Sequence, residues 1–295
     1  MRRFFATCLG SAFAAQRRTR ACLFAAFLLV NAGVLINALT HDPRIAYDAG
    51  QHLRYVDILS TGRLPLRVET AAYYSPPLPY LLPAFVRHAA NLRLATAARA
   101  ALLLQAVLSV VLTIALLAAC EGLRPGDGVM KLVALGLCCM PAVYYRTFAM
   151  LRGEAYLATL ATLLIVVSVG AVSRGHVRPR DVLVMALLSA AIALARQLGA
   201  LLLLGWGVFA VVQMVHGRRG WSSAIVASTI AVALLSGWFY LGLRDREGTA
   251  MAWNLPRASF SLANQPAEFY FGTGSGMLFS EPGRPRFQKQ LLPVL

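Results

Sequence analysis

Seven stretches of the chain consist mostly of apolar residues, and polar or charged residues separate them. We expect each stretch to form a helix that crosses a bilayer, which takes about 20 apolar residues. The first two are ACLFAAFLLVNAGVLINALT and AALLLQAVLSVVLTIALLAAC. The predicted spans are residues 21–40, 100–120, 129–147, 154–173, 181–196, 198–215 and 221–243. The fifth and sixth meet at Arg196 and Gln197, where the pattern allows either a tight hairpin or one long broken helix.

A basic segment, residues 1–21, precedes the first span. A secretory signal peptide would have a shorter apolar core of about 7–15 residues and a small-x-small cleavage site after it. The sequence LINALTHDP is a poor match to such a site. We therefore expect an uncleaved first span with a cytoplasmic N-terminus.

Short basic connections between spans predict the orientation, because Lys and Arg favour the cytoplasmic side. If every span crosses, these connections share one side with the N-terminus: residues 121–131, 174–180 and 216–220. The long loop 41–98 and the Pro- and Gly-rich tail 246–295 then face outward. Residues 78–90 are apolar but short and interrupted by proline, which is typical of a re-entrant or interfacial segment. The expected fold is an all-α, polytopic integral membrane helix bundle with seven spans and a long first outer loop.

Composition supports a membrane protein and argues against other classes. The 295 residues are 58% hydrophobic and 14% charged, whereas about a quarter of the residues in soluble domains are charged. The net charge of +16 lies mostly between apolar stretches, where it orients the chain and contacts lipid headgroups, so we expect no nucleic acid partner. The five cysteines lack zinc-ligand spacing, and we expect neither a cofactor nor a metal.

The long outer loop contains a group of polar residues at helical spacing. Asp48, His52 and Tyr55 lie at positions i, i+4 and i+7 of AYDAGQHLRYVDILSTG, a segment that predicts a short helix ending near Gly62. Asp57 falls outside this face and is expected to be solvated. A plain amphipathic helix on the membrane surface, with Asp48 in water, is the alternative interpretation.

A second polar group falls at the outer ends of later spans. The sequence VYYRTFAMLRGEAY places Arg146, Arg152 and Glu154 between the third and fourth spans, and Arg196 follows the fifth. Guanidinium groups bind phosphate oxygens and a carboxylate can accept a proton from a hydroxyl, so the set suits an anionic lipid-linked substrate. A surface ion pair between Arg152 and Glu154, and snorkelling of Arg196 to the interface, are the alternatives.

Together these motifs resemble the GT-C superfamily of membrane glycosyltransferases, over roughly residues 20–245. The resemblance rests on the first span, on Asp48 in an outward loop, on TGRLP, and on the run YYSPPLPYLLPA at residues 73–84. Members of this superfamily take a sugar from a polyprenyl-phosphate carrier. They include protein O-mannosyltransferases, aminoarabinose transferases and lipid-linked oligosaccharide glucosyltransferases.

The resemblance implies a role for each candidate residue. Asp48 would act as the general base on the acceptor hydroxyl, with His52 beside it. The donor phosphate would be bound by Arg146, Arg152 or Arg196. The supporting residues would be Glu154, Tyr74, Ser75 and Tyr80. Transfer with inversion would take place on the periplasmic or extracellular face of a bacterial cell membrane, to a lipid, glycan or protein acceptor.

The chain also departs from the superfamily pattern. Many members carry an acidic pair where this chain has Tyr47 and Asp48, and a basic residue where it has Ser75. Most are longer, and the tail ends on the apolar run LLPVL, so we expect it to be incomplete. Three alternatives stay open: a transporter or lipid flippase whose path the Arg and Glu residues line, an inactive truncated membrane protein, and a purely structural role for the stiff Pro-rich run.

Overall fold

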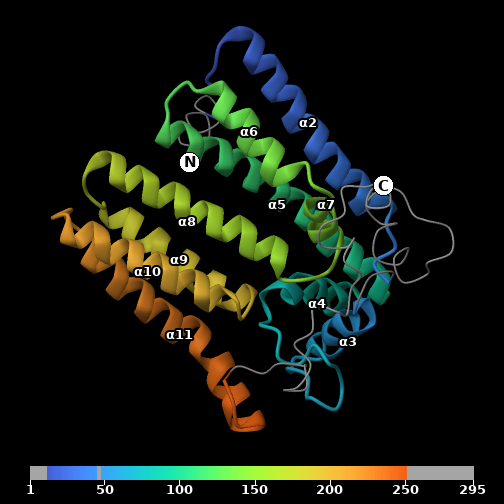
Figure 1. The fold of residues 1–295 in the computed structure, drawn as a ribbon. Coiled ribbons are helices and arrows are strands. Elements are labelled where there is room, and N and C mark those ends of the chain that lie inside the picture. Colours follow the sequence, from blue (N-terminus) through green and yellow to red (C-terminus); the bar gives the residue numbers. More distant parts are fainter. Residues whose placement is uncertain (1–11, 45–47, 251–295) are drawn as a thin grey trace, which may run out of the picture.

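The computed structural model describes residues 12–44 and 48–250. Within these ranges the chain is helical, and no strand occurs there (Figure 1). The helices are α2 (Arg17–Thr40), α3 (Ala49–Leu59), α4 (Leu78–Ala90), α5 (Leu94–Leu123), α6 (Gly128–Cys139), α7 (Ala142–Ala149), α8 (Glu154–Arg174), α9 (Pro179–Ala195), α10 (Gly199–Val215) and α11 (Trp221–Glu247). The predicted all-α fold class is confirmed for this part of the chain. Most of the predicted tail, residues 251–295, lies outside the described residues.

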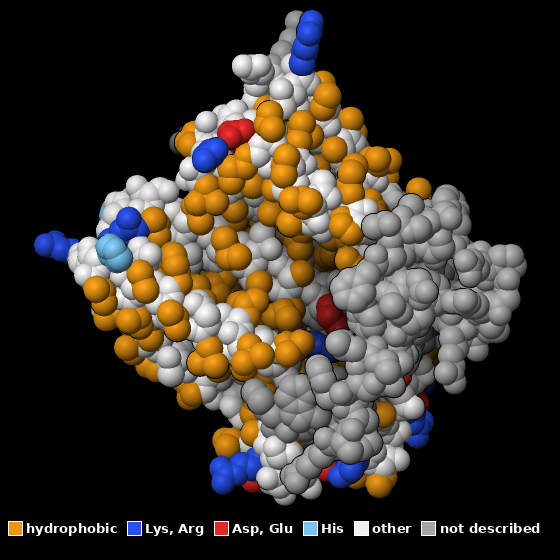
Figure 2. All heavy atoms as spheres, viewed as in Figure 1, with side chains coloured by type: hydrophobic (Ala, Val, Ile, Leu, Met, Phe, Trp, Pro, Cys, Tyr) orange, Lys and Arg blue, Asp and Glu red, His pale blue; other side chains and the backbone are white. Residues whose placement is uncertain are grey.

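Four helices are long and apolar enough to cross a membrane. They are α2, α5, α8 and α11, which correspond to the first, second, fourth and seventh predicted spans. Hydrophobic side chains cover much of the surface that Figure 2 shows. Large side chains such as Leu29, Leu204 and Leu234 are more than half exposed, which is unusual for a protein surrounded by water. These features are compatible with a membrane-embedded protein.

The stretch 129–147, predicted to be one span, is broken into two helices. α6 ends at Cys139 and α7 begins at Ala142, and the axes are bent by 61°. Pro141 explains the break, because it has an extended ψ of 145° and no N–H to donate to the preceding turn. The pair counts as a fifth membrane-crossing element only if its two parts act as one span.

At Arg196 and Gln197 the structure has the tight hairpin rather than a long broken helix. Arg196 is extended, with φ −159° and ψ 146°. Gly199 then packs so closely on α9 that a Cβ there would lie 2.5 Å from the carbonyl oxygen of Ile192. α9 and α10 have 17 residues each, fewer than a full span usually needs. By length and composition, the described residues contain four helices that could cross a membrane, or five if the bent pair α6 and α7 is one span.

Two of the hydrophobic clusters join the long helices. One joins α2, α5, α6, α7 and α8, and the other joins α8, α9, α10 and α11, so α8 belongs to both. A polar cluster lies within the first core. Ser109 of α5 donates to the side-chain oxygen of Asn31 in α2 at 2.8 Å, and Asn31 donates to Thr113 at 3.1 Å. Such bonds between helices are a usual means of helix association in membranes.

The connections gather at two ends of the bundle. At one end, the buried Lys131 of α6 pairs with Glu121 of α5 at 2.8 Å and donates to the carbonyl of Ala14 at 2.9 Å. The end of α8 lies there too, since Ser173 is 3.5 Å from the carbonyl of Gly122. The α8–α9 and α10–α11 connections meet beside it through a bridge between residues 176 and 219. The short basic connections predicted to share one side therefore share one end.

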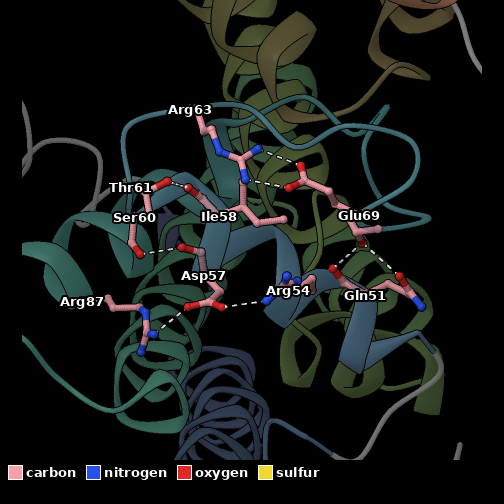
Figure 3. A network of polar contacts seen from close by, with 10 residues as sticks. Gln51, Arg54, Asp57, Ile58, Ser60, Thr61, Arg63, Glu69 and Arg87 are labelled. Atoms are coloured by element: carbon pink, nitrogen blue, oxygen red, sulfur yellow. Dashed lines mark hydrogen bonds and ion pairs between the residues drawn. The ribbon is translucent and has the colours of Figure 1, made fainter.

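The opposite end contains the predicted loop 41–98 with α3 and α4. α3 lies within the predicted segment, and Gly62 follows it with φ 84°. The prediction that Asp57 is solvated is wrong: its carboxylate pairs with Arg87 of α4 at 2.5 Å and with Arg54 at 3.2 Å (Figure 3). Asp57 therefore fastens α3 to α4. α4 has 13 residues, which confirms that this segment is too short to span.

Between α3 and α4 the chain folds back onto α3. Arg63 donates to both carboxylate oxygens of Glu69, at 2.7 and 2.6 Å (Figure 3). Thr70 donates to the carbonyl of Gln51 at 2.8 Å, and the backbone N–H of Ala71 donates to the Gln51 side-chain oxygen at 2.9 Å. These bonds fix the loop against the first turn of α3, which follows Asp48.

Candidate active site

Asp48 stands immediately before α3 with a left-handed backbone, φ 59° and ψ 11°. Only a few per cent of non-glycine residues adopt this conformation, with Asp and Asn enriched among them. The side chain makes no capping hydrogen bond to α3, although an acidic residue at this position commonly does. Because Asp48 precedes the first helical residue, the prediction that it shares a helical face with His52 and Tyr55 is wrong. Its carboxylate instead lies 3.9 Å from the guanidinium of Arg152.

Arg152 and Glu154 flank Gly153, where α8 begins. A Cβ on Gly153 would overlap the carbonyl oxygen of Ala195 at the end of α9, so only glycine allows the two helix ends to come this close. This approach brings Arg196 beside Glu154, with 3.0 Å between guanidinium and carboxylate. Arg196, for which snorkelling was an alternative, thus has an ion-pair partner. Two ion pairs, joining three separate parts of the chain, lie at this end of the bundle.

The charges at this site act on Asp48 and on Tyr74. Burial raises the pKa of the Asp48 carboxyl above its usual 3.8, and the positive charge of Arg152 opposes this rise. Burial also raises the pKa of Tyr74, while Arg196 and Arg152 oppose the rise and Asp48 adds to it. Tyr74 therefore lies within electrostatic range of both ion pairs. The side chain of Gln197 holds it there by donating to the Tyr74 carbonyl at 2.9 Å.

His52, Ser75 and Tyr80 form a buried group behind Asp48. The Nδ1 atom of His52 is 2.7 Å from the hydroxyl of Tyr80, and the Tyr80 ring stacks on Tyr55 with centroids 4.2 Å apart. Burial raises the pKa of Tyr80, and a hydrogen bond with the side chain of Ser75 opposes the rise. Burial, followed by the charges of Arg152 and Arg196, lowers the pKa of His52 to about 3. His52 is therefore neutral near pH 7, and it holds α3 against α4 rather than carrying charge.

Arg146 is not a member of either ion pair. It is in the last turn of α7, six residues before Arg152, and is partly buried. Its charge and that of Arg152 are close enough to influence each other. The structure thus brings Arg152 and Arg196 together with Asp48, and places Arg146 next to them along the chain.

Two residues that position the site were not predicted from the sequence to have a role in it. Gln105 of α5 is fully buried and its amide nitrogen lies 3.5 Å from the carbonyl of Arg152, a long contact at the start of α8. The sequence could have indicated Gln105, because it is a lone amide within an otherwise apolar stretch and polar residues inside membrane spans are costly. Gly153 is the second, and nothing in the sequence reveals the backbone that packs against it.

Several buried polar atoms at this site have no hydrogen-bond partner within the described part of the chain. They are Oε2 of Glu154, Oε1 of Gln105 and the hydroxyl of Tyr156. Buried polar groups usually have partners, so these atoms are available to a ligand. Figure 2 shows an acidic and a basic side chain at the bottom of a hollow in the hydrophobic face, near the start of α8 in Figure 1. Across residues 12–44 and 48–250, no three His, Cys, Asp or Glu side chains group closely enough to hold a metal.

Comparison with known proteins adds no relative. No family model matches the chain, and neither a curated protein nor a solved structure matches it.

Proposed function

We propose that the chain is a GT-C-type membrane glycosyltransferase that moves a sugar from a polyprenyl-phosphate carrier to a hydroxyl-bearing acceptor. The observation that carries this proposal is the 3.9 Å approach of Asp48 to Arg152, beside the pair of Arg196 with Glu154. A carboxylate and two guanidinium groups from three segments converge at one end of an apolar bundle. This combination suits a reaction in which a hydroxyl loses its proton and a phosphate departs.

In the proposed reaction, Asp48 accepts the proton of the acceptor hydroxyl as its oxygen attacks the anomeric carbon. The new C–O bond forms on the face opposite the phosphate, the bond to the phosphate oxygen breaks, and the polyprenyl phosphate leaves with the bonding electrons. The raised pKa of Asp48 makes it a stronger base than an ordinary aspartate. Arg152 and Arg196 stabilise the negative charge that develops on the leaving phosphate.

The surroundings of the site favour a lipid-linked donor. Exposed hydrophobic side chains line the bundle around the hollow in which the charged groups lie (Figure 2). A polyprenyl chain can pack on such a surface while its phosphate reaches the arginines. The buried and unpartnered Oε2 of Glu154 can accept a hydrogen bond from a sugar hydroxyl.

For the topology we propose seven crossings, with α6 and α7 acting as one bent span and α9 and α10 as two short spans. A helix of 17 residues is about 25 Å long, slightly less than a hydrocarbon core of about 30 Å. Seven crossings place the basic connections on the cytoplasmic side with the N-terminus, and the site on the periplasmic or extracellular side. The clustering of those connections at one end of the bundle supports this arrangement.

Sugar transfer in isolated membranes tests the function. Labelled polyprenyl-phosphate sugars are supplied to membranes that contain the wild type, Asp48→Asn or Asp245→Asn at matched expression. Asp245→Asn is the control, because it removes an exposed carboxylate near the end of α11 that lies outside both ion pairs of the site. We expect transfer by the wild type and the control, and a loss of about 100- to 10,000-fold for Asp48→Asn, the usual range for general-base catalysis.

Other outcomes would overturn the proposal. Equal transfer by Asp48→Asn and the wild type would remove the base from the mechanism. Donor binding without transfer by the wild type would favour a transporter or flippase, or an inactive protein.

A further inference from the structure

A second charged surface lies at the opposite end of the bundle from Asp48. It consists of the α8–α9 and α10–α11 connections, residues 174–180 and 216–220, here called the basic loop pair. These residues contain five arginines and no carboxylate. The nearest acidic residue in sequence, Asp181, already pairs with Arg174 at 2.5 Å and lies 3.7 Å from Arg180.

The two loops are about 40 residues apart in sequence but are fixed side by side. The N–H of Val177 donates to the carbonyl of Arg219 at 3.0 Å, within a parallel bridge between residues 176 and 219. Gly220 has φ 87°, and a Cβ there would lie 2.8 Å from the carbonyl oxygen of Val177. The packing therefore depends on glycine, and it holds the arginines of both loops in one surface.

Within this surface, Arg178, Arg180 and Arg219 are exposed. Among the described residues, no carboxylate forms an ion pair with Arg178 or Arg219. Two helices begin here, α9 at Pro179 and α11 at Trp221, and two end here, α8 at Arg174 and α10 at Val215, so the helix dipoles offset one another and the positive charge comes from the arginines. The surface therefore has an unneutralised positive potential that favours a phosphate group.

Exposed apolar side chains continue from the basic loop pair along the same two helices. Leu183 and Leu187 of α9 are 60% and 51% exposed, one to two turns beyond Arg180. Val226 and Ile230 of α11 are 57% and 52% exposed at the corresponding depth. Figure 2 shows this juxtaposition: Lys, Arg and His side chains lie at one tip of the molecule, next to hydrophobic side chains. A soluble phosphate would contact the arginines alone, whereas a phospholipid would contact both parts.

From this arrangement we infer that the basic loop pair, with the apolar faces of α9 and α11, is a binding site for an anionic diacyl phospholipid. The phosphodiester contacts Arg178 and Arg219, and the acyl chains lie along the two helices. This inference needs the membrane location but not the glycosyltransferase activity. It extends beyond a general attraction of basic loops to lipid, because it assigns the binding to one pair of loops.

Native mass spectrometry of the full chain in detergent tests the inference. The probes are dioleoyl phosphatidylglycerol, dioleoyl phosphatidylcholine and soluble glycerol 1-phosphate. The variant is Arg178→Gln with Arg219→Gln. The matched control is Arg20→Gln with Arg124→Gln, which removes the same charge from exposed residues at the same end but outside the basic loop pair.

We expect the wild type and the control to bind phosphatidylglycerol more tightly than phosphatidylcholine. Each basic residue near an anionic lipid surface gives about a fivefold gain, so the variant should lose about 25-fold in phosphatidylglycerol affinity. Its affinity for phosphatidylcholine, whose choline group offsets the charge of the phosphodiester, should fall much less. Its thermal midpoint should match that of the wild type because both side chains are exposed.

Three results would overturn the inference. An equal loss of phosphatidylglycerol affinity in the control would mean that positive charge anywhere at this end of the bundle attracts the lipid, without a defined site. Unchanged phosphatidylglycerol binding by the variant would mean that the two arginines are not involved. Glycerol 1-phosphate binding as tight as that of the lipid would assign the surface to a soluble anion.

Discussion

Replacing Gly153 by alanine should separate the two helix ends on which the candidate site is built. The backbone of Gly153 is ordinary for any residue, with φ −77° and ψ −13°, so the cost comes only from space. The added methyl group would overlap the Ala195 carbonyl, which lies in the backbone and cannot move without shifting the end of α9. Inserting a methyl group into a packed site costs about 1–3 kcal/mol. Such a shift would also lengthen the 3.0 Å contact between Arg196 and Glu154.

The control is Gly136→Ala in α6, where a Cβ would meet nothing within 4 Å. Alanine there should be neutral or stabilising by up to about 1 kcal/mol, because it is the better helix former. In thermal unfolding of the purified protein, Gly153→Ala should lower the midpoint temperature by about 2–4 °C for each kcal/mol of unfolding free energy that is lost. It should also weaken donor binding, which Gly136→Ala should leave intact. Equal midpoints and equal donor binding for the two variants would refute the close approach of α8 to α9.

Three further predictions follow from individual side chains. Because unfolded histidine takes up a proton near pH 6.5 and buried His52 only near pH 3, the wild type should lose about 1 kcal/mol of stability between pH 6.5 and 5.5; His52→Asn should show a smaller loss in thermal melts at these two values, and an identical loss would contradict the assignment. Asn31→Ala removes the bonds with Ser109 and Thr113 and should cost about 1 kcal/mol, which an unchanged thermal midpoint would rule out. The rate of transfer should fall toward acid pH with an apparent pKa above 3.8, since the pKa of the half-exposed Asp48 is raised; an apparent pKa at or below 3.8 would contradict Asp48 as the base.

The apolar pattern predicted most of the helices because burial in a bundle or in lipid requires long apolar stretches. The apolar pattern gave the wrong helix where a single residue has a stronger effect. At Pro141, the proline breaks a continuous apolar stretch into two helices. The pattern also could not give the number of crossings, because α9 and α10 turn sharply at Arg196 and are shorter than typical spans.

The candidate site was predictable as a set of residues but not as an arrangement. Unusual charges next to apolar stretches drew attention to Asp48, Arg152 and Arg196. Their pairing depends on the left-handed backbone of Asp48 and on the space that Gly153 leaves for α9. Both are consequences of tertiary packing, so residue spacing, which suggested a shared helical face for Asp48, gave the wrong geometry.

Donor binding and turnover, measured side by side, separate the role of the base from that of the arginines. Purified wild type, Asp48→Asn and Arg196→Gln are each titrated with a polyprenyl-phosphate sugar by native mass spectrometry, and transfer is measured in parallel. We predict that Asp48→Asn binds donor within about threefold of the wild type but loses transfer, since the base acts on the acceptor. Arg196→Gln should bind donor about 10- to 100-fold more weakly, the range for a charge-assisted hydrogen bond to phosphate. Donor binding that is unchanged in Arg196→Gln, or transfer that persists in Asp48→Asn, would contradict this division of roles.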